Sequence, residues 1–222
     1  MEGAESVHTN FIDALFDSSV ILSVNFVFLP SQLEYARHVL KRVAASQRIR
    51  HLGIVVNVQG DDLFAEVKEA VEANCSLRSF LYKGCNLNIV FPREFISILM
   101  TKKTLKTFSV FGFEHFSNIN NLVESTRLDG IVVKELNIPW EALHHDQLAQ
   151  RRFLEALAVN TTITKINLDY LKVGEDATTE CSAFARLFRE NATLKTVSMM
   201  FVMYINSFTE PVQDLFNSIA DN

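Results

Sequence analysis

A short apolar pattern recurs along this chain at nearly constant spacing. Each copy has apolar residues at its first, fourth and sixth positions, as in Leu105-Lys106-Thr107-Phe108-Ser109-Val110. We call the first residue of each copy its anchor. The anchors are separated by 28, 28, 28, 28, 30 and 31 residues and are Ile21, Ile49, Leu77, Leu105, Val133, Ile163 and Leu194. Such regularity is typical of a repeat protein in which each copy forms one structural unit.

Each copy is predicted to form a strand, and the residues after it are predicted to form a helix. Alternation of side chains within a copy indicates a strand that is buried on one side. The clearest helices are expected at residues 32–45, 61–73, 93–100, 147–159, 178–189 and 211–220. Strands joined by helical crossovers run parallel. A doubly wound sheet is the alternative, but its units vary in length and it carries a glycine-rich phosphate loop, which this chain lacks.

We therefore predict an α/β solenoid of about seven units, with parallel strands on the concave face and helices on the convex face. Residues 18–222 should form this single domain, and residues 1–17 an N-terminal capping segment. Within it, residues 10–16 should form a helix whose Phe11, Leu15 and Phe16 cover the first unit, while Leu215, Phe216 and Ile219 cover the last. The core should hold five repeat phenylalanines: Phe26, Phe80, Phe108, Phe153 and Phe184.

The repeat resembles a known family. A pattern Leu-x-x-Leu-x-Leu-x-x-Asn/Cys-x-Leu with a period of 28 residues resembles the ribonuclease-inhibitor type of leucine-rich repeat. Segments 153–163 and 188–194 are most similar to the C-terminal domain of tropomodulin. Asn57 and Cys85 fit the ninth position of this pattern. Five units depart from it with Leu29, Phe113, Glu141, Leu171 and Val202, so the resemblance implies the solenoid and leaves its subfamily open.

Composition and charge narrow the classes of partner. The net charge of −5 arises from 26 acidic and 21 basic residues spread along the chain, which argues against tight binding of nucleic acid. The acidic first residues and the interrupted apolar run at residues 20–29 predict neither an export signal nor a membrane anchor. Three cysteines without a Cys-x-x-Cys pair predict free thiols in the reducing cytoplasm.

No motif predicts catalysis. His144-His145-Asp146 is the only histidine–acid cluster, but no third ligand lies at helical spacing, and Asp146 is better placed to cap the helix that follows. The sequence also lacks a Gly-x-Ser-x-Gly elbow and a phosphate loop. We expect no enzymatic activity, no cofactor and no bound metal.

Three Asn-x-Ser/Thr sequons begin at Asn74, Asn160 and Asn191. Each asparagine lies three residues before an anchor, where the preceding helix should end. Asparagine tolerates the left-handed conformation that ends helices, so we attribute the sequons to the repeat rather than to glycosylation.

The strand face turned away from the core carries a candidate binding site. Its second position is basic in five units, at Arg50, Arg78, Lys106, Lys134 and Lys195. Aromatic residues follow near the eighth position. The predicted partner-binding residues are Lys106, Phe111, Lys134, Trp140, Lys165 and Tyr170. Aromatic residues flanked by cations resemble a protein-binding hot spot, although a solvated face with lysines for solubility explains the same residues.

These features favour a cytoplasmic scaffold or adaptor, monomeric, that binds a protein partner with an acidic segment. Two alternatives stay open. The resemblance to tropomodulin implies an actin-regulating module, and related repeat proteins also act as enzyme inhibitors or GTPase activators.

Overall fold

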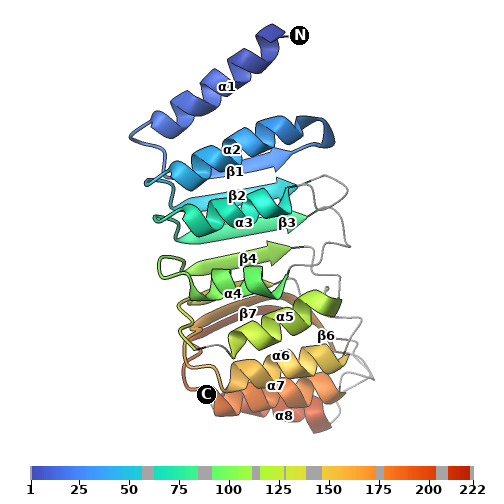
Figure 1. Ribbon diagram of the computed structural model, residues 1–222. Helices are drawn as coiled ribbons and strands as arrows, with labels where there is room; N and C mark the ends of the chain where they lie inside the picture. Colours follow the sequence, from blue (N-terminus) through green and yellow to red (C-terminus); the bar gives the residue numbers. More distant parts are fainter. Residues whose placement is uncertain are drawn as a thin grey trace.

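The chain forms one layer of parallel strands and one layer of helices (Figure 1). The structure is a computed structural model that describes residues 2–56, 63–84, 92–111, 116–127, 129–138, 147–173, 178–203 and 210–220. The strands are β1 (Ser23–Phe28), β2 (His51–Val56), β3 (Ser79–Gly84), β4 (Thr107–Phe111), β5 (Glu135–Ile138), β6 (Lys165–Val173) and β7 (Thr196–Met203). They lie in chain order in one sheet, as a solenoid-like repeat requires.

The strand register confirms the alignment of the copies. Every neighbouring pair of strands is parallel, and Ser23 pairs with His51, which in turn pairs with Ser79. The same row continues through Thr107, Glu135, Lys165 and Thr196. All seven are third residues of the predicted copies. Among the described residues, the register shifts in β6 between Leu168 and Tyr170.

The helices stack in chain order on one side of the sheet (Figure 1). They are α1 (Glu2–Asp17), α2 (Leu33–Ala45), α3 (Phe64–Ala73), α4 (Arg93–Thr101), α5 (Phe116–Thr126), α6 (Gln147–Ala158), α7 (Thr178–Glu190) and α8 (Glu210–Ala220), with a short 3-10 turn η1 (Pro30–Gln32) before α2. All six helices predicted above are present within a few residues of the expected bounds. Helix α5 was not among them because its residues include several weak helix formers. Burial of Leu122 and Val123 stabilises it instead.

The core lies between the sheet and the helices. Phe80, Phe108, Phe153 and Phe184 are fully buried there, as predicted. Such side chains contribute about 1.5–3 kcal/mol each when buried. Phe26 is only partly buried, because it belongs to the first unit, and it stacks on the rings of Phe16 and Phe28.

Asparagine side chains connect consecutive units where helices end. Asn74 Oδ1 accepts hydrogen bonds from the backbone N–H groups of Ser76 (2.9 Å) and Leu77 (2.8 Å). Asn74 Nδ2 donates to the carbonyl oxygens of Val43 (2.8 Å) and Ser46 (2.9 Å) in the preceding unit. One buried amide group therefore turns the chain from its own helix into its own strand and ties both to the previous unit.

Asn160 and Asn191 repeat this arrangement. Asn160 Oδ1 accepts from the N–H of Ile163 at 2.8 Å, and its Nδ2 donates to the carbonyl of Thr126 at 3.1 Å. Asn191 Nδ2 donates in turn to the carbonyl of Asn160 at 3.0 Å. We call this place, three residues before each anchor, the helix-exit position.

The expected left-handed conformation at these asparagines is wrong. Asn74 has φ −68° and ψ 118°, and no described residue other than glycine has a positive φ. The side-chain hydrogen bonds, rather than backbone strain, end the helix. All three side chains are buried with their amide groups engaged, which leaves no room for a glycan.

Helix α1 covers the first unit with Leu15 and Phe16, as predicted, but not with Phe11. Ile12 (1% exposed) and Phe16 are buried, and Leu15 packs against the core, whereas Phe11 is 63% exposed. Ile12 therefore takes the place that was predicted for Phe11. The next residue, Asp13, faces α2 and contacts Arg42 Nε at 3.2 Å and His38 Nε2 at 3.1 Å.

The burial of Ile12 in place of Phe11 makes a direct prediction. Ile12→Ala should lower the free energy of unfolding by about 2 kcal/mol, because it opens a cavity beneath α1. Phe11→Ala, one residue away, should change it by less than about 0.5 kcal/mol. Urea unfolding followed by circular dichroism measures both. Equal effects of the two substitutions would mean that Phe11 contributes to the cap as much as Ile12 does.

At the other end, α8 buries Leu215 as predicted, and Phe216 is partly buried. Ile219 was expected to cover the last unit but is 41% exposed. The inward face of α8 consists of Val212, Leu215 and Ser218, and α8 packs on α7. Ile219 therefore lies at the margin of the last unit.

Candidate functional site

The second-position cations form one continuous column along the sheet. The backbone N–H of Arg50 donates to the carbonyl of Leu22 at 2.8 Å, and that of Arg78 to the carbonyl of Arg50 at 2.7 Å. The same bond links Lys106 to Arg78 (2.7 Å) and Lys134 to Lys106 (2.8 Å). We call Arg50, Arg78, Lys106 and Lys134 the basic column. Hydrogen-bonded strands are about 4.8 Å apart, so its four side chains start from backbone positions spread over about 14 Å.

The side chains of the basic column are exposed at the edge where the strands begin. Within the described ranges, no ion pair involves Arg50, Arg78 or Lys106. Lys134 Nζ donates to the carbonyl of Thr162 at 3.2 Å. Like charges at this spacing repel one another, and an acidic ligand would relieve that repulsion.

Lys165 differs from the basic column although it was predicted with it. Its Nζ lies 2.7 Å from Glu135 Oε1, on the neighbouring strand. These two residues are third-position neighbours in the register of β5 and β6. The charge of Lys165 is thus already compensated within the protein. The column also breaks here, because Thr164 occupies the second position and Lys195 continues it only one unit later.

Two of the predicted aromatic residues, Phe111 and Tyr170, lie on strand segments away from the basic column. Phe111 is the last residue of β4, and Tyr170 lies in the second half of β6. Lys106 precedes Phe111 by five residues, so about 16 Å of strand separates their backbones. The side chains of Phe111 and Tyr170 lie outside the described part of the structure, as do Trp140 and the His144-His145-Asp146 cluster. The predicted site therefore spans both ends of the strands.

Small polar residues occupy several fifth positions of the copies, on either side of Leu81. Asn137 Nδ2 donates to Ser109 Oγ at 2.7 Å across β4 and β5. Asn25 lies directly over Gly53, where an added Cβ would meet Asn25 Oδ1 at 1.9 Å. Sequence reasoning did not single out these residues. Aligning the fifth positions of the copies would have shown them.

Comparison with known proteins adds no relative. No family model matches the chain, and no curated protein matches it either. None of the described helices is both long and apolar enough to cross a membrane. Among the described residues, no three histidine, cysteine or acidic side chains gather in a way that could hold a metal ion.

Proposed function

We propose that this protein is a non-catalytic scaffold of the leucine-rich-repeat type, which binds an acidic segment of a partner protein along the basic column. The observation that carries the proposal is the hydrogen-bonded row that brings cations from four successive units into one exposed line. Residues 28 apart in sequence become neighbours, and folding does not require them to be charged.

The spacing of the column favours an acidic helix over an extended peptide. Three steps along the column cover about 14 Å. Three turns of an α-helix cover about 16 Å, and acidic residues at three- and four-residue spacing lie on one face. Alternate residues of an extended peptide would cover about 20 Å over the same three steps. Flexible arginine and lysine side chains absorb the smaller mismatch with less splaying than the larger one.

A pair of synthetic peptides tests this proposal. The first carries four glutamates along one face of a helix. The second has the same composition, with its glutamates distributed around the helix. We expect the first peptide to bind at least about tenfold more tightly, since only its charges can all meet the column. Binding should weaken as salt concentration rises, because exposed charges are screened.

Charge reversal locates the site. Arg78→Glu combined with Lys106→Glu should weaken binding of the first peptide by at least about tenfold, because two attractions become repulsions. The matched control is Lys41→Glu combined with Arg152→Glu, which makes the same change in net charge on exposed residues of α2 and α6. Fluorescence anisotropy measures both. Equal weakening by the two pairs would mean that only net charge matters and would exclude the basic column as a site.

A further inference from the structure

The last unit of the sheet leaves its apolar residues partly uncovered. In the sixth unit the three apolar strand residues, Ile163, Ile166 and Leu168, are at most 1% exposed. Their counterparts in the seventh unit are Leu194, Val197 and Met199, and all three are only partly buried. Interior units are covered on both sides, whereas the seventh has a neighbouring strand on one side within the described residues.

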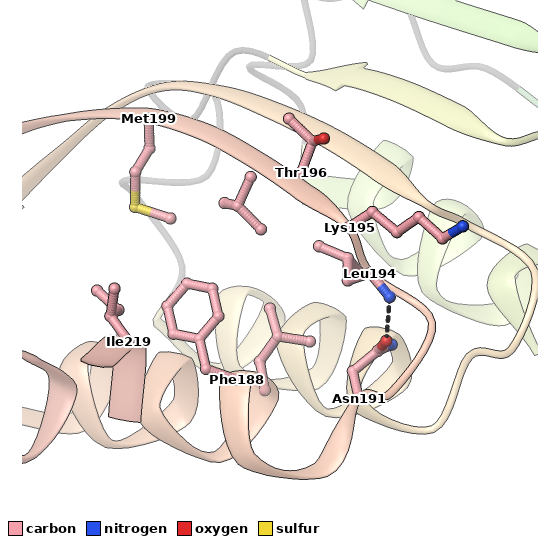
Figure 2. Close-up of a pocket in the computed structure, with 9 residues that line it drawn as sticks. Phe188, Asn191, Leu194, Lys195, Thr196, Met199 and Ile219 are labelled. Atoms are coloured by element: carbon pink, nitrogen blue, oxygen red, sulfur yellow. Dashed lines mark hydrogen bonds between the residues drawn. The ribbon is translucent and has the colours of Figure 1, made fainter. Parts of the chain in front are cut away.

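A cavity of about 370 Å³ opens at this place (Figure 2). It lies between β7 and the two last helices. Phe188 of α7 and Ile219 of α8 lie across from Met199 of β7, and Asn191 forms one end, where its side chain accepts the N–H of Leu194 at 2.7 Å. In the layer of helices α8 lies next to α7, and the cavity separates these two helices from β7. Its lining combines apolar side chains with Asn191, Lys195 and Thr196, and such an opening at the end of a core is a candidate interaction site.

The edge of β7 is equally suited to an interaction. Its eight residues, Thr196–Met203, include no charged residue, proline or glycine. Protected edge strands usually carry such residues, which prevent pairing with another chain. Strand β7 pairs with β6 along one side, and no described strand pairs with its other side.

The occupant that fits this end is a second copy of the chain. A neutral strand can pair antiparallel with its own copy without bringing like charges together. Lys195, just before β7, would lie at the opposite end of the strand pair from its counterpart. The N-terminal end differs, because α1 caps the first unit with Ile12 and Phe16, whereas no described helix follows α8 at the last unit. Association is therefore between two C-terminal ends, which closes after two copies.

The surface at the C-terminal end of the sheet and helix layers is large enough for a specific dimer interface. A strand of eight residues spans about 26 Å, and the strand and helix layers together are about 20 Å deep. The end of the solenoid then offers about 500 Å² per copy, or about 1,000 Å² for a pair, which is near the lower limit for a specific interface. An interface of that size fits a dimer of moderate affinity.

We propose that two copies associate through their C-terminal ends, with β7 paired antiparallel to β7 of the second copy and apolar side chains of each copy filling the cavity of the other. The sequence analysis predicted a monomer, because it did not reveal this open end. The dimer does not depend on the proposed peptide-binding function, because the basic column lies in other units.

Sedimentation velocity between about 1 and about 200 µM tests the dimer, since association of this kind follows mass action. We expect the mass to rise from one copy to two. Ile219→Asp should raise the dissociation constant at least tenfold, because pairing would bury a carboxylate. The isolated chain should tolerate this change, because Ile219 is already 41% exposed. The control is Leu148→Asp on α6, where leucine is 54% exposed, and it should leave the dissociation constant unchanged.

Hydrogen exchange of the wild-type protein provides a second measurement that needs no variant. Amide exchange in β7 should slow as concentration rises, while exchange in β2 stays constant. A mass of one copy at every concentration would overturn the proposal. A mass that grows beyond two copies, a dimer equally affected by both substitutions, or exchange in β7 that is independent of concentration would overturn it as well.

Discussion

Asn74→Ala should lower the free energy of unfolding by about 3 kcal/mol. The substitution removes the acceptor of the buried Leu77 N–H and the donor to the Val43 carbonyl. A buried polar group left without a partner costs about 1–3 kcal/mol, and this change leaves at least two such groups. Chemical denaturation measures the effect.

Lys102→Ala is the control, because Lys102 occupies the helix-exit position of the next unit without an asparagine amide. Lys102 Nζ donates to the carbonyl of Glu72 at 3.1 Å, and burial lowers the pKa of this lysine. We expect its loss to cost less than about 1 kcal/mol. If Asn74→Ala cost no more than this control, water would be replacing the asparagine, and the amide would not be the link between units.

Phe153→Ala should lower the free energy of unfolding by about 3–5 kcal/mol, because Phe153 is fully buried among interior units and its loss leaves a large cavity. Phe188→Ala should cost less than half as much. Phe188 lies at the open end of the solenoid, where it is only partly buried beside the existing cavity.

The comparison of these two variants tests whether burial between neighbouring units, rather than residue type, sets the stabilisation. Both substitutions remove the same atoms from a helix of the same layer. Thermal and urea unfolding should rank them in the same order. Equal losses would imply that Phe188 is as tightly enclosed as Phe153, and the open end would then not exist in solution.

The order of elements and the strand register could be predicted because they depend on spacing and alternation. A period of 28 residues places Ser23 beside His51 and His51 beside Ser79 regardless of the intervening helix. The burial of single helix residues depends on finer contacts. Leu15 and Phe16 of α1 pack as predicted, but Ile12 is buried in place of Phe11, and nothing local in residues 10–16 indicates the contact of Asp13 with Arg42.

The candidate site was only partly predictable for a related reason. The cations of the basic column share one repeat position, so alignment of the copies finds them. The ion pair of Lys165 with Glu135 could be predicted only by comparing the third positions of neighbouring copies with one another. Lys106 and Phe111 are only five residues apart in sequence, but an extended strand places their backbones at its opposite ends.

The constant register of the first five strands has an evolutionary consequence. Residues pair at a separation of 28 from β1 through β5, and this separation lengthens only at β6 and β7. Duplication or loss of the second, third or fourth 28-residue unit would leave every remaining strand facing a neighbour of the same kind. It would lengthen or shorten the basic column by one cation. Copy number could thus tune the length of acidic surface recognised, without redesign of any single interface.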